Sequence, residues 1–315
     1  MPFYQNDREV WLVSSRDQWL ARRQRNIGAS EVAALFHAHQ FTTAYQLWCL
    51  HTGRLKREDE DSDAMRRGRI FEPAVGEALR EMHPEWIIQP ARQYIELRSL
   101  RLGATPDFYA WQSRESFEAG DRPFLIQAKV VTEDVFEADW TPTPPAGYLL
   151  QVQAEMMIAG AARNILAVMV LDGRKFPVHE YPFVADVEIH AQIAEAARRF
   201  WHCVERQVEP TLHHPQDAWA IAKLYPDTVP DVLALHGKLS ITQACEAYIT
   251  LGKQIKALEA ERETLASKLK GELRNHAYAD AQDYRISWPV VPGHVRPQVE
   301  VKAHRRFSVT KRKTS

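Results

Sequence analysis

Long hydrophobic runs are absent from this sequence, and so is a dense set of cysteines. No apolar stretch approaches the roughly 18 consecutive residues that a membrane-spanning helix needs, so we expect no membrane span. The first residues, MPFYQNDREVW, lack the basic start and apolar stretch of a secretory signal, which predicts a cytoplasmic location. The three cysteines, Cys49, Cys203 and Cys245, lie far apart, which argues against a disulfide framework and a CxxC metal site.

An excess of charge of one sign is also lacking, since 40 Lys and Arg nearly balance 41 Asp and Glu. The charges are unevenly placed, however. Residues 58–63 read EDEDSD, whereas the last twenty residues carry seven Lys and Arg against the single acid Glu300. Such a basic tail is consistent with contact to phosphates, which releases counterions, and equally with a solvated terminus.

The length of 315 residues exceeds that of one ordinary domain and predicts a large domain with an appendage. The character of the sequence changes after Pro215, so we place the boundary between 1–215 and 216–315. Apolar periodicity in the first part predicts helices over residues 30–50, 65–82, 148–159 and 187–204. We expect Ser30 to cap the first helix, Pro73 to break or bend the second, and the last to pack on a sheet.

Short extended segments predict the strands of that sheet. Residues 86–88 and 94–97 are extended in pattern, and RLGATPDFYAW and FLIQAKVV follow as neighbouring central strands joined by a polar surface loop. Residues 165–171 are followed by Asp172 and Gly173, which are a hairpin signal, and HEYPFV supplies the return strand. The first domain is therefore predicted to mix helices and strands.

The appendage contains a stretch with heptad spacing. Its a and d positions over residues 248–269 hold Tyr248, Leu251, Ile255, Leu258, Leu265 and Leu269, and Arg262 interrupts one a position. A helix packed against its own protein is favoured over a coiled coil, because about three heptads is near the lower limit for a coiled coil. Residues 284–291 and 299–309 then predict a small hairpin.

Polar residues interrupt one predicted central strand. Strand alternation directs Gln127 and Lys129 to one face, and Asp107 lies at the start of the preceding strand. If the two strands pair, these three side chains converge at one edge of the sheet. Oxygen ligands hold hard cations such as Mg²⁺, and a nearby ammonium orients or deprotonates a water, which is the minimum for phosphodiester hydrolysis. Each part is a weak signal alone, since Pro-Asp turns and solvent-facing Gln and Lys are common.

Five motifs occur together and in order, and they strengthen this interpretation. They are RRQRNIGASEV, GRIFEP, GATPD, QAK and YLLQVQAEM. Through these motifs the chain resembles, over about residues 15–205, the YqaJ-type viral recombinases that include lambda exonuclease and belong to the PD-(D/E)xK nuclease superfamily. The resemblance implies an α/β, restriction-endonuclease-like fold with a mixed central sheet flanked by helices.

The resemblance also implies roles for the residues that match the motifs. Asp107, Gln127 and Glu72 would hold a metal, and Lys129 would be the catalytic lysine. Gln151 would join the active-site network near Tyr148. Arg23 and Ser30 would hold the 5′-phosphate of the substrate. The physics of the last site agrees, because amides at a helix start and an Arg guanidinium both bind phosphate. For Gln151 and Gln153, an exposed polar helix face is the alternative.

The activity implied by the resemblance is 5′ to 3′ digestion of one strand of linear double-stranded DNA in phage-type recombination. Mg²⁺ would be the cofactor, with Mn²⁺ as a substitute. The implied partners are double-stranded DNA ends, a single-strand annealing protein and further copies of the chain.

One residue departs from the family's pattern. Gln127 stands where the (D/E)xK element has an acid, so this ligand supplies only an amide oxygen and metal affinity should fall. An alternative function is therefore a catalytically weak or inactive DNA-binding relative, although Asp107, Lys129 and Glu72 are retained. A further alternative is an assembly factor that associates through residues 248–270, but it leaves the five motifs unexplained.

Four histidines are conceivable metal ligands. These are His37, His39, His213 and His214, and none has a cysteine or carboxylate at zinc-site spacing. We expect all four to be surface residues.

Overall fold

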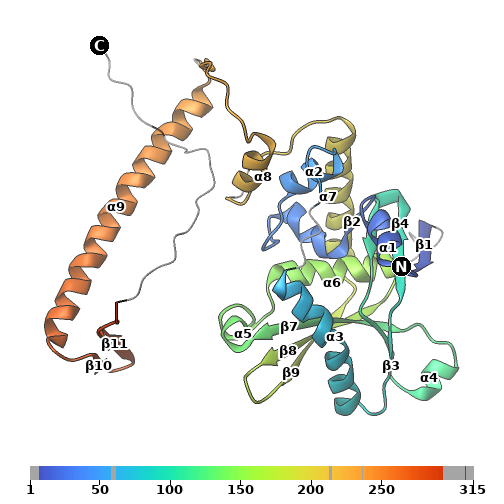
Figure 1. Cartoon of the computed structure of the whole chain (residues 1–315). Coiled ribbons are helices and arrows are strands. Elements are labelled where there is room, and N and C mark those ends of the chain that lie inside the picture. The colour runs from blue at the N-terminus through green and yellow to red at the C-terminus, as the bar shows by residue number, and fades with distance from the viewer. Residues whose placement is uncertain (1–6, 58–61, 213–214, 236, 294–308, 310–315) are drawn as a thin grey trace. The chain divides into compact units, whose positions relative to one another are not determined.

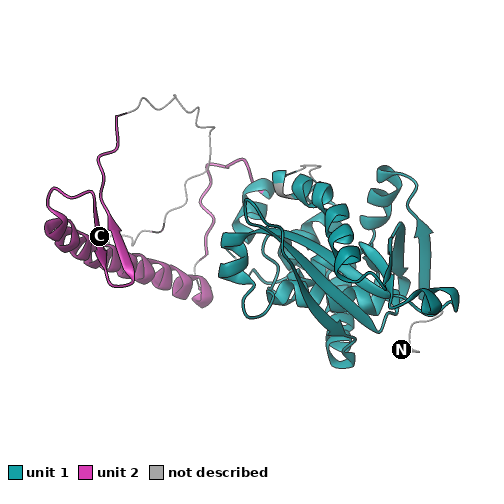
Figure 2. Ribbon diagram, turned by 90° about the horizontal axis from the view of Figure 1, so that it is seen from below, with its two compact units in different colours: residues 1–224 teal, residues 225–315 magenta. Residues whose placement is uncertain are grey.

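The computed structural model describes residues 7–57, 62–212, 215–235, 237–293 and 309. The acidic run at 58–61, His213 and His214, the basic tail, and the predicted strand at 299–309, apart from Val309, lie outside the described residues. The chain divides into two compact units, residues 1–224 and 225–315 (Figure 2).

The first unit is built on a mixed five-stranded sheet. Its strands are β3 (Ile87–Pro90), β6 (Phe108–Trp111), β7 (Phe124–Thr132), β8 (Arg163–Leu171) and β9 (Val178–Val184), in the order β3-β6-β7-β8-β9. Only β7 and β8 pair in parallel, and the other neighbours are antiparallel. The predicted pairing of two central strands and the predicted hairpin at Asp172 are both confirmed.

Helices cover both faces of this sheet, so the predicted fold class is confirmed (Figure 1). On one face α3 (Asp63–Met82) buries Val75 and Leu79 against Phe108 and Ile126. On the other, α6 (Ala146–Ala159) packs Val152 against the strand β8. Because side chains alternate along β7, the face that carries Leu125, Gln127 and Lys129 is turned towards α6.

A second, four-stranded sheet extends the first unit. Its order is β1-β4-β5-β2, with β1 (Arg8–Leu12), β4 (Gln93–Leu97), β5 (Leu102–Ala104) and β2 (Ile27–Gly28). The main core of the unit joins β4 and β5 to α6, α2 (Ala44–His51), α7 (Val187–Glu205) and α8 (Asp217–Leu224). The helix predicted at 187–204 is thus confirmed, but α7 packs into this core and not on the five-stranded sheet.

The remaining elements of the first unit are short. They are α1 (Arg16–Arg23), the 3₁₀ helices η2 (Ala29–Phe36) and η3 (Arg98–Leu100), α4 (Arg114–Glu118) and α5 (Glu133–Asp139). The loop predicted between β6 and β7 contains α4.

Two helix predictions need correction. The helical pattern over residues 30–50 is two elements, because η2 ends at His37 in a left-handed conformation with φ of 56° before α2 begins. The N-cap of η2 is Gly28 and not Ser30. The Gly28 N–H donates to the Glu31 carboxylate at 2.9 Å. Pro73 lies inside α3, which continues through it as one helix, so the predicted break is absent, and the bend that was the other possibility stays a prediction.

The first unit ends at residue 224, beyond the boundary expected at 215. The helix α8 belongs to it because Ala220 is fully buried in the main core. In addition, Gln46 Nε2 donates to the Gln216 carbonyl at 2.9 Å. Residues 216–224 therefore complete the core of the first unit.

The second unit consists of a long helix and a hairpin. The helix is α9 (Leu239–Leu273), and the hairpin joins β10 (Tyr278–Ala281) to β11 (Tyr284–Ser287). The strand predicted at Tyr284 is confirmed, but its partner precedes it in the chain. Within the second unit the heptad side chains of α9 are exposed, and the packing of this helix against its own protein stays a prediction. In the parts of the chain that the structure describes, no helix is apolar over a length that would cross a membrane.

Candidate active site

Asp107 and Gln127 meet where β6 begins and β7 runs beside it. The register pairs Phe108 with Ile126, so the residue before Phe108 lies next to Gln127. Asp107 Oδ2 accepts hydrogen bonds from Gln127 Nε2 at 2.5 Å and from the Ala128 N–H at 2.8 Å. The convergence predicted from strand alternation is therefore found.

The amide of Gln127 is buried, and its nitrogen points to Asp107. The side chain is 4% exposed, and Nε2 also donates to the Ala128 carbonyl at 3.3 Å. Among the described residues, neither Gln127 Oε1 nor Asp107 Oδ1 takes part in a hydrogen bond. One oxygen of each side chain thus remains for a ligand, while the amide nitrogen holds the carboxylate in place.

Lys129 supplies the positive charge of this cluster. Its Nζ lies 5.4 Å from the centre of the Tyr148 ring, which comes from α6. Burial raises the pKa values of Glu72 and Asp107, and the charge of Lys129 offsets part of this rise. Glu72 from α3, Asp107 at the start of β6 and Lys129 from β7 are therefore close enough to interact electrostatically.

The two carboxyl groups are costly to ionise together. Burial, followed by the charge of Asp107, raises the pKa of Glu72 to about 7. Burial also raises the pKa of Asp107 to about 6, although Lys129 and two hydrogen bonds act in the opposite direction. Such a pair is stabilised in its ionised form by a bound cation, because the cation offsets the repulsion and the lost hydration.

Glu155 belongs to the same cluster, and the sequence did not identify it. It is 2% exposed on α6 and accepts hydrogen bonds from Gln151 Nε2 at 2.8 Å and Asn164 Nδ2 at 3.0 Å. Burial, and then the charge of Asp107, raises its pKa to about 7. A carboxylate four residues after Gln151 in an otherwise apolar helix was the available signal.

Gln151 and Gln153 are both buried, so the exposed polar helix face is wrong as an interpretation. Gln151 reaches the cluster through Glu155. Gln153 instead donates to the Val184 carbonyl at 2.9 Å and accepts from the Asp186 N–H at 3.0 Å, so it fastens α6 to the end of β9.

The donor set suits a hard divalent ion. Within the described residues, no three His, Cys, Asp or Glu side chains form a group that could hold a metal. The cluster nevertheless offers the carboxylates of Asp107 and Glu72 and the free amide oxygen of Gln127. Mg²⁺ is commonly bound through one or two carboxylates and keeps several waters, so these residues fit it. His39 is no candidate, because its Nδ1 accepts the N–H groups of Phe41 and Thr42.

Arg23 and Ser30 converge beside Gly28. A Cβ atom at Gly28 would lie 3.7 Å from Ser30 Oγ and 3.8 Å from Arg23 Nε. Both side chains are partly exposed. A hydroxyl, a guanidinium and the first turn of η2 therefore border one small space, which is the chemistry that binds a phosphate.

Two further contacts fix this space. Burial alone would raise the pKa of Glu31, but the charges of Arg23 and Arg57 and hydrogen bonds from Arg57 and Gly28 hold it below its ordinary value. Glu31 thus holds Arg23, whose Nη2 lies 3.8 Å from its carboxylate. Trp19 Nε1, one turn before Arg23, donates to Thr105 Oγ1 at 3.0 Å. The Arg23 guanidinium carbon lies 5.0 Å from the centre of the Trp19 ring, so Trp19 links Arg23 to Thr105, which lies two residues before Asp107.

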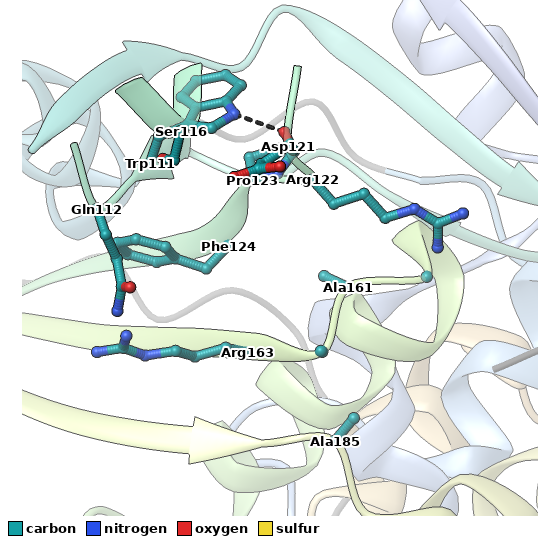
Figure 3. Close-up of a pocket in the computed structure, with 12 residues that line it drawn as sticks. Trp111, Gln112, Ser116, Asp121, Arg122, Pro123, Phe124, Ala161, Arg163 and Ala185 are labelled. Atoms are coloured by element: carbon teal, nitrogen blue, oxygen red, sulfur yellow. Dashed lines mark hydrogen bonds between the residues drawn. The ribbon is translucent and has the colours of Figure 1, made fainter. Parts of the chain in front are cut away.

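A cavity of about 340 Å³ lies elsewhere, at the opposite end of the β6–β7 pair (Figure 3). Trp111 and Phe124 line it from the strands, and Arg122 and Arg163 extend in different directions around it. None of the predicted site residues lines this cavity.

Residues 18–162 match the family described as the YqaJ-like viral recombinase domain. The uncharacterized protein YqaJ of Bacillus subtilis is 22% identical over 285 residues, which cover 89% of this chain and 86% of that protein.

Solved structures include an alkaline exonuclease from Laribacter hongkongensis, which is 19% identical, with a TM-score of 0.46 over 66% of this chain and 100% of that one. A phage-related exonuclease from Haemophilus somnus is 11% identical, with a TM-score of 0.38 over 58% of this chain and 96% of that one. The family match spans every predicted site residue from Arg23 to Gln151, and it confirms the resemblance carried by the motifs: residues 18–162 are similar to the YqaJ-like viral recombinase domain.

Proposed function

We propose that this protein is a metal-dependent DNA exonuclease that digests linear double-stranded DNA from 5′ to 3′ in phage-type recombination. The observation that carries the proposal is the cluster of Asp107, Gln127 and Lys129, and the convergence of Arg23 and Ser30 beside Gly28 supports it. A hydrolytic site together with an anion site suits an enzyme that acts at a phosphorylated strand end. The match to a viral recombinase family supports action on DNA in recombination.

Asp107, Gln127 and Glu72 would hold the metal, with Mg²⁺ as the natural ion and Mn²⁺ as a substitute. A bound Mg²⁺ would polarise the scissile phosphate and lower the pKa of a coordinated water. Gln127 would contribute through its free Oε1, while its Nε2 keeps Asp107 oriented. Glu155 and Gln151 would keep the α6 side of the cluster in place.

Lys129 would act directly on the reacting groups. An ammonium at this position attracts the phosphate that is cut and holds the attacking water by a hydrogen bond. The Tyr148 ring lies beside Nζ and limits where the ammonium points. This preorganisation favours the transition state, because the charge is in place before negative charge develops.

Arg23 and Ser30 would bind the 5′-terminal phosphate. This contact would place the first phosphodiester at the carboxylate cluster and so set the polarity from 5′ to 3′, leaving 3′ single-stranded tails. The further partners that we propose are a single-strand annealing protein, which would take over those tails, and additional copies of this chain.

The alternative function is a DNA-binding relative that cleaves weakly or not at all. Gln127 favours it, since the amide adds no negative charge to attract a cation. Incubation of the purified protein with linear and covalently closed duplex DNA, with Mg²⁺ or Mn²⁺, separates the two functions. We expect digestion of the linear DNA alone. Binding of both DNAs without digestion under either metal would instead support the alternative.

A further inference from the structure

Glu155 is a buried acid that is surrounded as an ionised carboxylate would be. It is 2% exposed, and its Oε1 accepts from Gln151 Nε2 at 2.8 Å while its Oε2 accepts from Asn164 Nδ2 at 3.0 Å. Within the described ranges, no Lys, Arg or His nitrogen lies within 4.0 Å of this carboxylate. Because a buried charge needs a partner of opposite sign, the charge that balances Glu155 must act from further away than a direct ion pair.

Glu155 approaches the proposed metal site from the side of α6. Leu125 of β7 packs with Met156, the residue after Glu155. Gln127 follows Leu125 on the same face of β7, since side chains alternate along a strand. Burial, and then the charge of Asp107, raises the pKa of Glu155, and Gln127 Nε2 donates to Asp107. Glu155 is therefore within electrostatic reach of the pair that Asp107 and Gln127 form.

The charges of this cluster do not balance. Burial raises the pKa values of Glu72, Asp107 and Glu155, and the charge of Lys129 offsets part of the rise at each of them. In the parts of the chain that the structure describes, no second cation lowers the pKa of these three acids. Fully ionised, the cluster carries a net charge of −2, because three carboxylates meet one ammonium. This excess equals the charge of one divalent cation.

The balance depends on the amide at position 127. Gln127 stands where the (D/E)xK element has an acid, so it adds no charge. Glu72, Asp107 and Lys129 alone would leave a net charge of only −1. Glu155 supplies the second negative charge from α6, as an acid at position 127 would have supplied it from β7.

We propose that Glu155 gives the metal site the negative charge that Gln127 lacks. The proposal rests on the proposed metal-dependent function. Glu155 acts through its charge and not as a ligand, because Gln151 and Asn164 occupy both of its oxygens. Its charge strengthens the attraction of a divalent ion to the neighbouring ligands, and the two amides keep that charge in place.

Metal binding in the absence of DNA tests the proposal. The melting temperature of the full-length protein is followed at pH 8 as Mg²⁺ or Mn²⁺ is added, since an ion that binds the folded state raises it. Glu155→Gln keeps the size of the side chain and removes its charge, and Glu137→Gln, at an exposed position of α5, is the matched control. We expect Glu155→Gln to raise the apparent Kd for the metal at least about 10-fold and the control to match wild type.

Rescue from β7 separates the charge of Glu155 from its packing. The double variant Gln127→Glu/Glu155→Gln moves the acid from α6 to β7, so its apparent Kd should return to within about threefold of wild type. A purely structural role of Glu155 would leave the double variant as weak as Glu155→Gln. The double variant should also bind the metal at least about 10-fold more weakly than Gln127→Glu, and this comparison tests the charge even if Glu155→Gln alone fails to fold.

The outcomes distinguish this proposal from the proposed function. Equal metal binding by wild type and Glu155→Gln, or a double variant that binds no better than Glu155→Gln, overturns the role of Glu155 alone. Equal binding by Gln127→Glu and the double variant overturns it as well. A wild type whose melting temperature responds to neither metal overturns the proposed metal dependence together with the role of Glu155.

Discussion

Gln127 is the residue on which the chemistry of the cluster depends most. Its amide nitrogen donates to Asp107, so a carboxylate at this position would replace an attractive contact by repulsion between two acids. A divalent ion would remove that repulsion. The same substitution should therefore weaken the empty site and strengthen its affinity for metal.

Two variants of Gln127 test this. Gln127→Ala should remove cleavage at every practical Mg²⁺ concentration, because both the ligand and the contact that orients Asp107 are lost. Gln127→Glu should cleave with a lower Mg²⁺ concentration at half-maximal rate. Its melting temperature should also rise more on addition of Mg²⁺ than that of wild type. Equal cleavage by wild type and Gln127→Ala would make Gln127 a bystander, and cleavage by Gln127→Glu alone would favour the inactive relative.

Lys129 is predicted to act in hydrolysis and not in docking. Lys129→Met keeps an unbranched apolar stem beside Tyr148 but removes the charge, so cleavage should fall by at least about 100-fold while DNA binding is retained. Lys223→Met is the matched control, since its Nζ lies 5.6 Å from the centre of the Trp219 ring, outside the site. Single-turnover cleavage and DNA affinity are measured for both, and undiminished cleavage by Lys129→Met rejects the role.

Arg23 is predicted to recognise the strand end. Arg23→Ala should reduce cleavage of 5′-phosphorylated ends by the roughly 1.5 to 3 kcal/mol of a charged hydrogen bond, and it should barely affect 5′-hydroxyl ends. Arg22→Ala is the control from the same helix, because the Arg22 guanidinium stacks on Trp11 at 3.3 Å and does not face Gly28. An equal loss on both kinds of end would contradict phosphate recognition.

Glu155 should make stability depend on pH. Its folded pKa of about 7 exceeds the ordinary 4.5, so the folded state retains a proton that the unfolded state has already lost between these values. Stability is therefore lost as pH rises through this window, by roughly 3 kcal/mol in a metal-free buffer. Glu155→Gln should show a smaller fall in melting temperature between pH 5 and pH 8 than wild type. Exposed Glu137→Gln is the control, and a fall as large in Glu155→Gln as in wild type would exclude Glu155 as its source.

At the scale of elements, the strands of the five-stranded sheet were predictable because their signals are local. The pairing of β6 with β7 follows from two apolar runs joined by a short polar loop, and this pairing places Asp107 beside Gln127. The break between η2 and α2 was missed, because apolar periodicity continues through residues 30–50 while His37 takes a left-handed conformation. A pattern of apolar residues does not predict a left-handed backbone conformation at a residue other than glycine.

The tertiary contacts of α6 and η2 give two acids a part that the motifs did not indicate. Glu155 and Glu31 are buried, and partners such as Asn164 and Arg57 lie on other parts of the chain. The motifs contain both acids, but sequence reasoning gave roles only to Gln151 and Ser30 beside them. It did not find the acids that hold the site together, since their partners are brought near only by folding.

At the scale of the whole molecule, the residue at which the first unit ends determines which truncation removes the appendage without damaging the core. A cut after residue 215 removes α8, with Ala220 from the core and the Gln216 carbonyl that Gln46 contacts. A cut after residue 224 retains these contacts. The two truncations therefore separate loss of the appendage from damage to the core.

Residues 1–224 should keep nuclease activity per site, because every proposed catalytic residue lies within them, and should melt close to the first transition of the full chain. Residues 1–215 should melt lower by roughly 5 to 15 °C, since a buried helix and a hydrogen bond are lost from a unit of this size. Calorimetry and a linear-duplex assay on both truncations provide the measurements. Loss of all activity in a folded 1–224 would support the assembly factor, because association through α9 would then be required for function. Equal melting of the two truncations would instead show that α8 contributes nothing to the core.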